Sequence, residues 1–401
     1  MSISIYSVLT TFLWFNLFVL LLCFLRWKLK IILGYSLLPL SMLLILSTMR
    51  LLLPLEPSFA IVLRSEQLLP LMQTLLRTKV ITIGSTNITL AMLVVLVLLI
   101  VSVVRIAHIL LLIHRMTQRM ATYTQTDDIR VLSIFERIQE ESPSRRKCHL
   151  CVSNHDSWPC IWGLTYSIVI LPEEALLLSD QDLYYILKHE WQHHIGNDVA
   201  VKLFIEILCC VTWWNPPVFL LKHNLNQTLE LKCDENVMKQ LRPEQRVDYA
   251  EALVNVIKLC TEKEFKASRE ELIAIPFLGS ASSREKRADI NIIQRLDAML
   301  EFNRPNGKIP LFFCTCLILL FVFSFCFVLQ PYSLPPEEDL LTSPNSEAVI
   351  ELLEVTPETS LLVDNQDGTY SLFVDGEYWR DITAKERTRE PYQALPITTI
   401  T

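Results

Sequence analysis

The sequence predicts a mainly α-helical, polytopic membrane protein, with four transmembrane helices and a cytosolic α+β domain between the third and fourth helices. Composition is the first reason: 51% of the 401 residues are apolar and 20% are charged. With a mean hydropathy of +0.34, such a chain is too hydrophobic for an ordinary soluble protein unless its apolar residues gather in spans. Their segregation into separate runs is the second reason.

Four apolar runs approach the ~20 residues that cross a bilayer as a helix. They are residues 5–25, 31–54, 88–104 and 309–330. The first run has no basic segment before it and no small-residue cleavage site, so we interpret it as a retained span rather than a secretory signal. We therefore expect three helices within residues 1–104, with an outer loop at 55–87, and a fourth helix at 309–330.

Basic residues set the expected orientation, because Lys and Arg favour the cytosolic side of a membrane. The clusters lie between the first two spans, after the third and before the fourth: Arg26, Lys28, Lys30; Arg105, His114, Arg115, Arg119; Arg304, Lys308. They place the N-terminus and the tail outside and residues 105–308 in the cytosol. All 11 cysteines lie in spans or on that inner side, as expected of reduced thiols. The net charge of −7 argues against direct binding of nucleic acid.

One helix-like stretch, residues 184–198 (YYILKHEWQHHIGND), contains the pattern HExxH at His189, Glu190 and His193. On a helix, positions i and i+4 lie on one face, so both imidazoles can hold the same ion. Glu190 then projects beside the ion and can act as the base. The pattern predicts a zinc site with hydrolytic chemistry.

A hydrolytic zinc site needs a third protein ligand and leaves one position for water. The downstream candidates are Glu230 and Asp234, one helical turn apart in TLELKCD. One of these carboxylates can bind the metal while the other accepts the free ring N–H of a ligand histidine. Asp198 either caps the following helix or orients a motif residue. Cys148 and Cys151 form a CxxC pair without a partner pair, which favours buried or free thiols.

Two further segments bear on the site. Residues 161–172 alternate and then become apolar and β-branched, which predicts one or two strands. Residues 203–221 are apolar enough for a fifth span, but a single crossing would separate Glu230 from His189. The segment is therefore buried in the domain, or it dips into the membrane and returns through the break at 215–217 (NPP).

These motifs and the surrounding hydrophobic runs resemble the gluzincin metallopeptidases, specifically the membrane-bound antirepressor peptidases of the BlaR/MecR type. The resemblance covers roughly residues 1–330. It implies Glu230 as the third ligand of one Zn²⁺ per chain and Asp234 as the group that orients a ligand histidine. It also implies that residues 161–172 form the edge to which a substrate pairs, and that the chain cuts itself near 277–288.

The tail departs from that family, whose members carry a penicillin-binding sensor with SxxK and KTG motifs. No KTG triplet occurs in this chain, so we do not expect residues 331–401 to sense beta-lactams. The Asp-Gly pairs at 367–368 and 375–376 are hairpin signals and predict a small β meander at about 361–382. We expect the last 20 residues to be disordered.

Together, these observations predict an integral-membrane zinc metalloendopeptidase of signal transduction. It would cleave a cytosolic repressor-like protein, or itself, with Glu190 moving the proton between water and the leaving amine. Two alternatives remain: a housekeeping quality-control protease of the HtpX or CAAX-processing type, and a non-catalytic transducer that keeps zinc for structure. The intact Glu190 argues against the transducer, because a structural zinc site has no use for that carboxylate.

Overall fold

The computed structural model describes most of the chain, including the segments that carry the predicted motifs. The described residues are 5–27, 37–55, 59–65, 68–83, 86–120, 125–154, 158–267, 308–331, 359–365, 368–374, 376–384 and 392–399, with a few single positions between them, among them 295. The predicted self-cleavage region at 277–288 and the basic residues Lys28, Lys30 and Arg304 lie outside the described residues.

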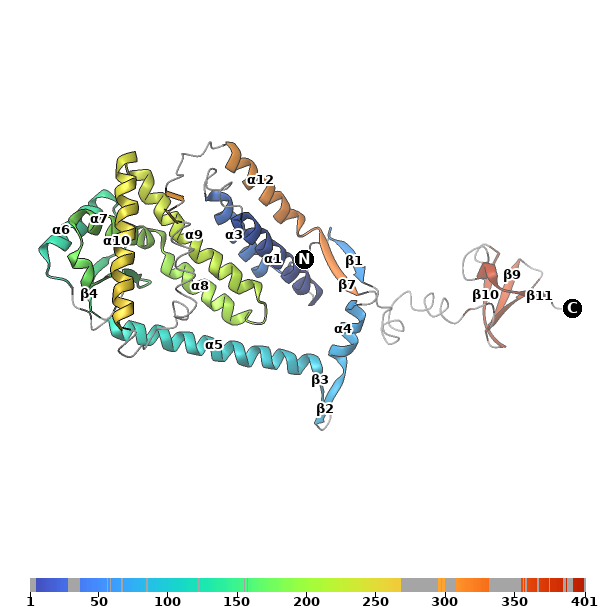
Figure 1. Ribbon diagram of the computed structural model, residues 1–401. Coiled ribbons are helices and arrows are strands. Elements are labelled where there is room, and N and C mark those ends of the chain that lie inside the picture. Colours follow the sequence, from blue (N-terminus) through green and yellow to red (C-terminus); the bar gives the residue numbers. More distant parts are fainter. Residues whose placement is uncertain are drawn as a thin grey trace. The chain divides into compact units, whose positions relative to one another are not determined.

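Helices dominate the chain (Figure 1). In chain order they are α1 (Ile5–Trp27), α3 (Leu38–Leu52), α4 (Leu68–Arg77), α5 (Leu90–Met120), α6 (Ile129–Glu141), α7 (Asp180–Gly196), α8 (Asp198–Val211), α9 (Pro217–Gln240), α10 (Pro243–Ala267) and α12 (Lys308–Phe323), with a short 3₁₀ helix, η1, at Glu173–Leu177. Two compact units divide the chain, residues 1–65 with 71–330 and residues 66–70 with 331–401.

Two of the described helices are long and apolar enough to cross a membrane, α5 and the stretch Tyr6–Arg26 of α1. They coincide with the first and third predicted spans, although α5 continues past residue 104 to Met120. Helices α3 and α12 are apolar but shorter, with 15 and 16 residues. The four-helix membrane topology therefore stays a prediction.

The expected fourth helix is wrong at its C-terminal end. Helix α12 ends at Phe323, and Phe327–Pro331 form strand β7, which pairs with β1 (Ile61–Ser65). Aromatic and β-branched residues such as Phe327 and Val328 favour a strand where a partner is available. Strands β2 (Lys79–Ile83) and β3 (Thr86–Thr89) form a separate antiparallel hairpin.

Helices α1, α3 and α12 lie side by side, and α9 packs against the first two of them (Figure 1). Their shared apolar core includes Phe18 of α1, Leu43 of α3 and Val218 of α9, all fully buried. The chain reverses at the break at 215–217, since α8 ends at Val211, α9 begins at Pro217 and the two helices pack against each other. Glu230 on α9 can thus lie beside α7.

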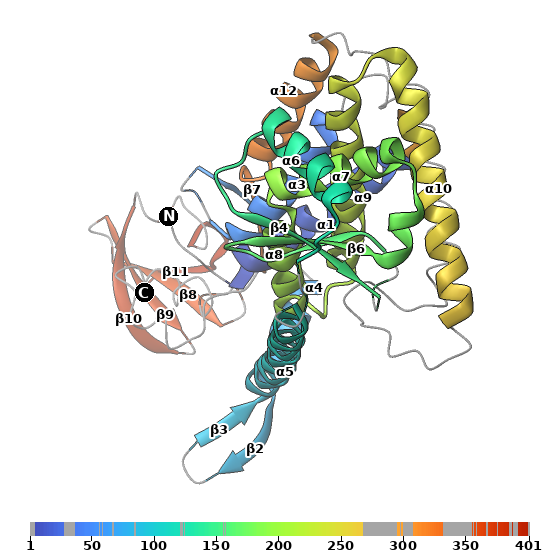
Figure 2. The ribbon, with the colours of Figure 1, turned by 90° about the vertical axis from the view of Figure 1, so that its left-hand side faces the viewer.

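A three-stranded sheet flanks the motif helix (Figure 2). Its strands, β4 (Cys148–Ser153), β5 (Cys160–Trp162) and β6 (Ser167–Pro172), are arranged in the order β4-β6-β5. Strand β6 is parallel to β4 and antiparallel to β5, so it is paired on both sides. The prediction of one or two strands at 161–172 is confirmed. Of these two strands only β5 lies at an edge of the sheet, whose other edge is β4, so the expectation of an edge strand is corrected for β6.

Side-chain caps and one large aromatic residue position α6 and α7. Asp128 accepts from the backbone N–H groups at the start of α6, and Ser179 does so at the start of α7. Trp191, 2% exposed, packs edge-on against Phe135 of α6 with ring centroids 5.6 Å apart. Its indole N–H also donates to the Ser142 carbonyl at 2.8 Å. Trp191 is therefore one of the contacts that fix the motif helix against α6.

The tail unit contains a four-stranded sheet in the order β10-β9-β8-β11. Strands β8 (Ser360–Asp364), β9 (Thr369–Val374) and β10 (Glu377–Thr383) form the predicted antiparallel meander. Strand β11 (Ile397–Thr399) pairs in parallel with β8 and follows the 3₁₀ helix η3 (Tyr392–Ala394), so the expectation of a disordered end is wrong there. Burial of Tyr392 and Leu395 against the sheet explains this order.

We expect Trp191→Ala to lower the free energy of unfolding by about 3–5 kcal/mol, because the change leaves a cavity and an unsatisfied carbonyl. SDS titration in mixed micelles measures this change. Leu177→Ala is the control, since Leu177 is 81% exposed and its loss should cost no more than about 0.5 kcal/mol. Equal effects of the two changes would contradict the packing role of Trp191.

Candidate metal centre

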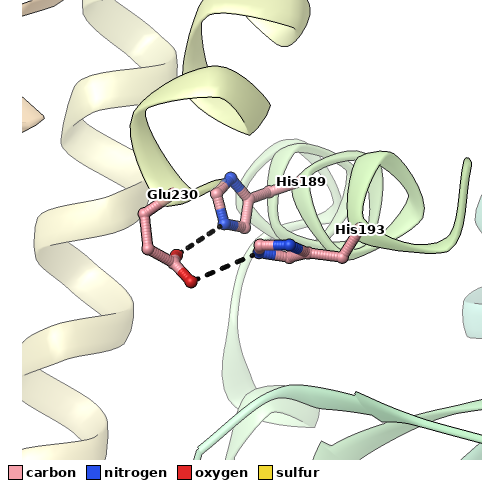
Figure 3. A group of neighbouring side chains, drawn as sticks. All are labelled: His189, His193 and Glu230. Atoms are coloured by element: carbon pink, nitrogen blue, oxygen red, sulfur yellow. Dashed lines mark ion pairs between the residues drawn. The ribbon is translucent and has the colours of Figure 1, made fainter. Parts of the chain in front are cut away.

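The three predicted ligands lie together between α7 and α9 (Figure 3). His189 Nε2 is 3.4 Å from Glu230 Oε2, and His193 Nε2 is 3.5 Å from Glu230 Oε1. Both histidines are buried, and the Glu230 side chain is 33% exposed. The structure thus brings one carboxylate and two ring nitrogens to a common point that is open to solvent on one side.

This geometry fits a tetrahedral metal site. Ligand atoms at ~2.0–2.2 Å from a zinc ion lie roughly 3.3–3.6 Å from one another, close to the 3.4 and 3.5 Å between the Glu230 oxygens and the two ring nitrogens. Two imidazoles and one carboxylate are also the donor set of hydrolytic zinc sites. A single ion could therefore be held by His189, His193 and Glu230.

The outer ring nitrogens of both histidines contact carboxylates. His193 Nδ1 lies 2.6 Å from Asp198 Oδ2. His189 Nδ1 lies 3.1 Å from Asp234 Oδ1, and the Tyr249 hydroxyl also donates to that oxygen, at 2.6 Å. These contacts allow each Nδ1–H to donate outward, which leaves each Nε2, on the side of Glu230, available to a metal ion. For Asp198, the contact with His193 favours the orienting role over the capping role, because Asn197 occupies the N-cap position of α8 and Asp198 is the first residue of the helix.

A tight turn between α7 and α8 brings Asp198 to His193. Asn197 adopts a left-handed conformation with φ of 55°, which Asn tolerates better than most residues. A Cβ atom on Gly196 would lie 2.6 Å from Asp198 Oδ1, so only glycine leaves room for this carboxylate. In the sequence, the pair Gly196-Asn197 is the signal that a helix ends there in a tight turn.

Sequence reasoning missed Arg295. Its Nε and Nη2 each donate to an oxygen of Asp234 at 2.7 Å, and its Nη1 is 3.6 Å from Glu230 Oε2. Burial raises the pKa of Asp234, but the charge of Arg295 and the hydrogen bonds from His189 and Arg295 lower it more, so the pKa of this carboxyl lies well below its usual range. Arg295 follows Asp234 by 61 residues in sequence, and no local pattern links the two.

Lys202 of α8 was also missed. Its Nζ lies 3.6 Å from Glu230 Oε1. Burial lowers the pKa of Lys202, but the carboxylates of Glu230, Asp198 and Glu190 together raise it more, so the ammonium keeps its charge. Glu190 itself is 8% exposed on α7, directly after His189. The predicted base and an unpredicted cation therefore belong to the same cluster of charges.

Cysteines near the site have a structural role. Cys233 Sγ lies 3.3 Å from His193 Nδ1, but burial raises the pKa of this thiol to about 11. Metals bind the thiolate, so Cys233 fits the small buried residue that its position in the sequence suggested. Cys148 and Cys151 are three positions apart on strand β4, which directs their side chains to opposite faces.

Glu141 of α6 holds the residue before His189. Its Oε2 accepts from Lys188 Nζ at 2.8 Å and from the Tyr184 hydroxyl at 2.5 Å. Burial raises the pKa of Glu141, but the hydrogen bonds from Lys188 and Tyr184 outweigh it and lower the pKa below 4.5. This cluster fixes one face of the motif helix to α6.

Comparison with known proteins adds a family match. Residues 4–273 match the family described as BlaR1 peptidase M56. The chain is 25% identical over 163 residues to the regulatory protein BlaR1 of Bacillus licheniformis. The aligned region covers 41% of this chain and 26% of that protein. It is also 25% identical over 178 residues to the methicillin resistance mecR1 proteins of Staphylococcus aureus and Staphylococcus epidermidis, covering 43% of this chain and 29% of each relative. The chain thus spans less than a third of the length of these relatives.

The Glu141 cluster predicts a pH-dependent contribution to stability. Because the folded-state pKa is lowered, the contribution is present above pH 4.5 and is lost as the pH falls through the lower folded value. We expect Glu141→Gln to destabilise by less than about 1 kcal/mol at pH 7, since the carboxylate is partly exposed, and to have no effect at acidic pH. Unfolding curves across pH test this, with Glu136→Gln on the same helix as control; a deficit independent of pH would contradict it.

Proposed function

The chain belongs to the BlaR1 peptidase M56 family, and on that premise we propose that it is an integral-membrane zinc metalloendopeptidase of signal transduction. Its family consists of membrane metalloproteases. One observation carries the assignment of the site: His189 and His193 each turn Nε2 toward Glu230 while a carboxylate holds Nδ1. Such an arrangement positions two neutral imidazoles for one metal ion.

In the proposed reaction, His189, His193 and Glu230 would hold the zinc ion. An ion held there would supply Lewis acidity to a water molecule and to the carbonyl of the substrate. Glu190 takes a proton from that water and later delivers it to the nitrogen of the leaving amine. Asp234 and Asp198 keep the histidines in the required tautomer, and Arg295 holds Asp234 through its two bonds of 2.7 Å.

The proposed substrate is a cytosolic repressor-like protein, the chain itself, or both. The distribution of basic residues supports a cytosolic site, with the N-terminus and the tail outside. The apolar hairpin of α8 and α9 supports a position of the site close to the inner leaflet, because Phe204 and Ile207 of α8 are exposed. Its substrates would then approach from the cytosol.

The decisive comparison is between wild type and Glu190→Gln in membranes that also contain candidate repressors. We expect both proteins to bind about one zinc ion per chain and only wild type to give a defined cut, detected by mass spectrometry. Glu251→Gln, an exposed change on α10, should behave as wild type. Identical peptides from wild type and Glu190→Gln under every signal tried would refute the peptidase function.

Asp198 provides a second prediction, which concerns metal affinity. We expect Asp198→Asn to weaken zinc binding by roughly 10- to 100-fold, because the amide no longer holds the Nδ1–H of His193 as a carboxylate does. Competition with a chromogenic zinc chelator measures this affinity. Asp248→Asn, which changes an exposed contact to Gln181, is the control. Unchanged affinity in Asp198→Asn would remove this role.

A further inference from the structure

We propose that Lys202 is a further catalytic residue, whose ammonium group donates to the carbonyl oxygen of the scissile peptide bond as that oxygen becomes negative. This inference rests on the proposed peptidase function and deepens it. Peptide hydrolysis places charge on the carbonyl oxygen, and a fixed donor aimed at that charge is a large contribution to the rate. The residues proposed so far supply a base but no such donor.

The position of Lys202 on α8 places it at the site. It lies one helical turn after Asp198, so both side chains project from the same face of the helix, and Asp198 contacts His193. Lys202 Nζ lies 3.6 Å from Glu230 Oε1, the oxygen that faces His193 Nε2. The ammonium therefore lies beside the proposed metal ligands, on the His193 side.

Strand β5, at one edge of the sheet, packs against helix α7, which carries Glu190. An extended peptide that added to this edge would pass close to the helix that carries the proposed base.

Arg295 is the rival donor, since its Nη1 lies 3.6 Å from Glu230 Oε2 and its Nη2 3.4 Å from His189 Nε2, but Asp234 holds its guanidinium group in place. Two of its nitrogens donate to Asp234 at 2.7 Å, and its side chain is 18% exposed. Lys202 is 38% exposed, and its one ion pair among the described residues is the 3.6 Å contact with Glu230, too long for a hydrogen bond. Its three N–H donors on a flexible stem can therefore turn to a substrate.

The step balances without a further reactant. The oxygen of a water molecule bonds to the carbonyl carbon, its proton passes to Glu190, and the π electrons move to the carbonyl oxygen, which accepts from Lys202. Those electrons then re-form the carbonyl as the C–N bond breaks, and the amine nitrogen takes the proton from Glu190. Lys202 ends the cycle with the protons it had at the start.

The test uses the full chain in detergent, reconstituted with zinc. A peptide library from a bacterial proteome, analysed by mass spectrometry, first identifies a cleaved peptide. That peptide and its phosphinic analogue, in which a phosphinate replaces the scissile bond, are the probes. The variants are Lys202→Met, Lys202→Arg and the control Lys239→Met, which removes an exposed lysine from α9 that pairs with Glu235 at 2.8 Å.

We expect Lys202→Met to lower kcat per bound zinc roughly 100- to 1,000-fold while KM stays within about threefold, because the contact forms in the transition state. Affinity for the phosphinic analogue should fall by a comparable factor. Zinc affinity of the chain, measured by chelator competition, should stay at the wild-type value. Lys202→Arg should recover part of kcat, and Lys239→Met should match wild type.

Two results would overturn the assignment. If Lys202→Met keeps kcat per bound zinc, with or without weaker zinc binding, Lys202 merely supports Glu230 and the proposal is wrong. If wild type binds zinc but cleaves no peptide of the library, the proposed function fails and the role of Lys202 fails with it. An active wild type with an equally active Lys202→Met would reject the role of Lys202 alone.

Discussion

The contacts between the histidine Nδ1 atoms and their carboxylates are the constraint on which the site depends. Two imidazoles on one helix can face a common point only if each ring is held from behind, and the holding groups come from different elements. Asp198 comes from the start of α8 and Asp234 from the C-terminal half of α9. Helices α7, α8 and α9 must therefore pack together correctly before the two histidines can face one metal ion, so the site depends on the folding of the domain.

That requirement connects the site to the apolar helices of the first unit. Helix α9 carries Glu230 and Asp234, and its N-terminal half packs into the core that α1 and α3 share. Arg26, at the end of α1, donates to the Gln227 side chain at 2.6 Å and to the Asn224 carbonyl at 3.1 Å. Because these partners precede Glu230 by about one to two turns, a shift of α1 would act directly on the helix that holds the proposed third ligand.

How much of the site could be predicted depended on whether its geometry was local. His189 and His193, and likewise Glu230 and Asp234, are one turn apart, and helical periodicity alone places each pair on one face. Tyr249 and Arg295 reach Asp234 only through tertiary packing, so their spacing gave no signal. The fold divides in the same way into local and distant features. The tail hairpins were predictable from Asp-Gly pairs, which are local signals. Strands β7 and β11 were not, because each forms only by pairing with a strand distant in sequence, β1 and β8 respectively.

The charges of the cluster are compatible with a bound divalent ion. Glu190, Glu230, Asp198 and Asp234 bring four carboxylates to the site, and among the described residues Lys202 and Arg295 bring two cations. When both histidines bind a metal they are neutral, and the cluster then carries two negative charges in a largely buried volume, which is costly unless they are compensated. An ion of charge +2 between the two Nε2 atoms and Glu230 cancels that excess, and it does so at the point toward which these ligands converge.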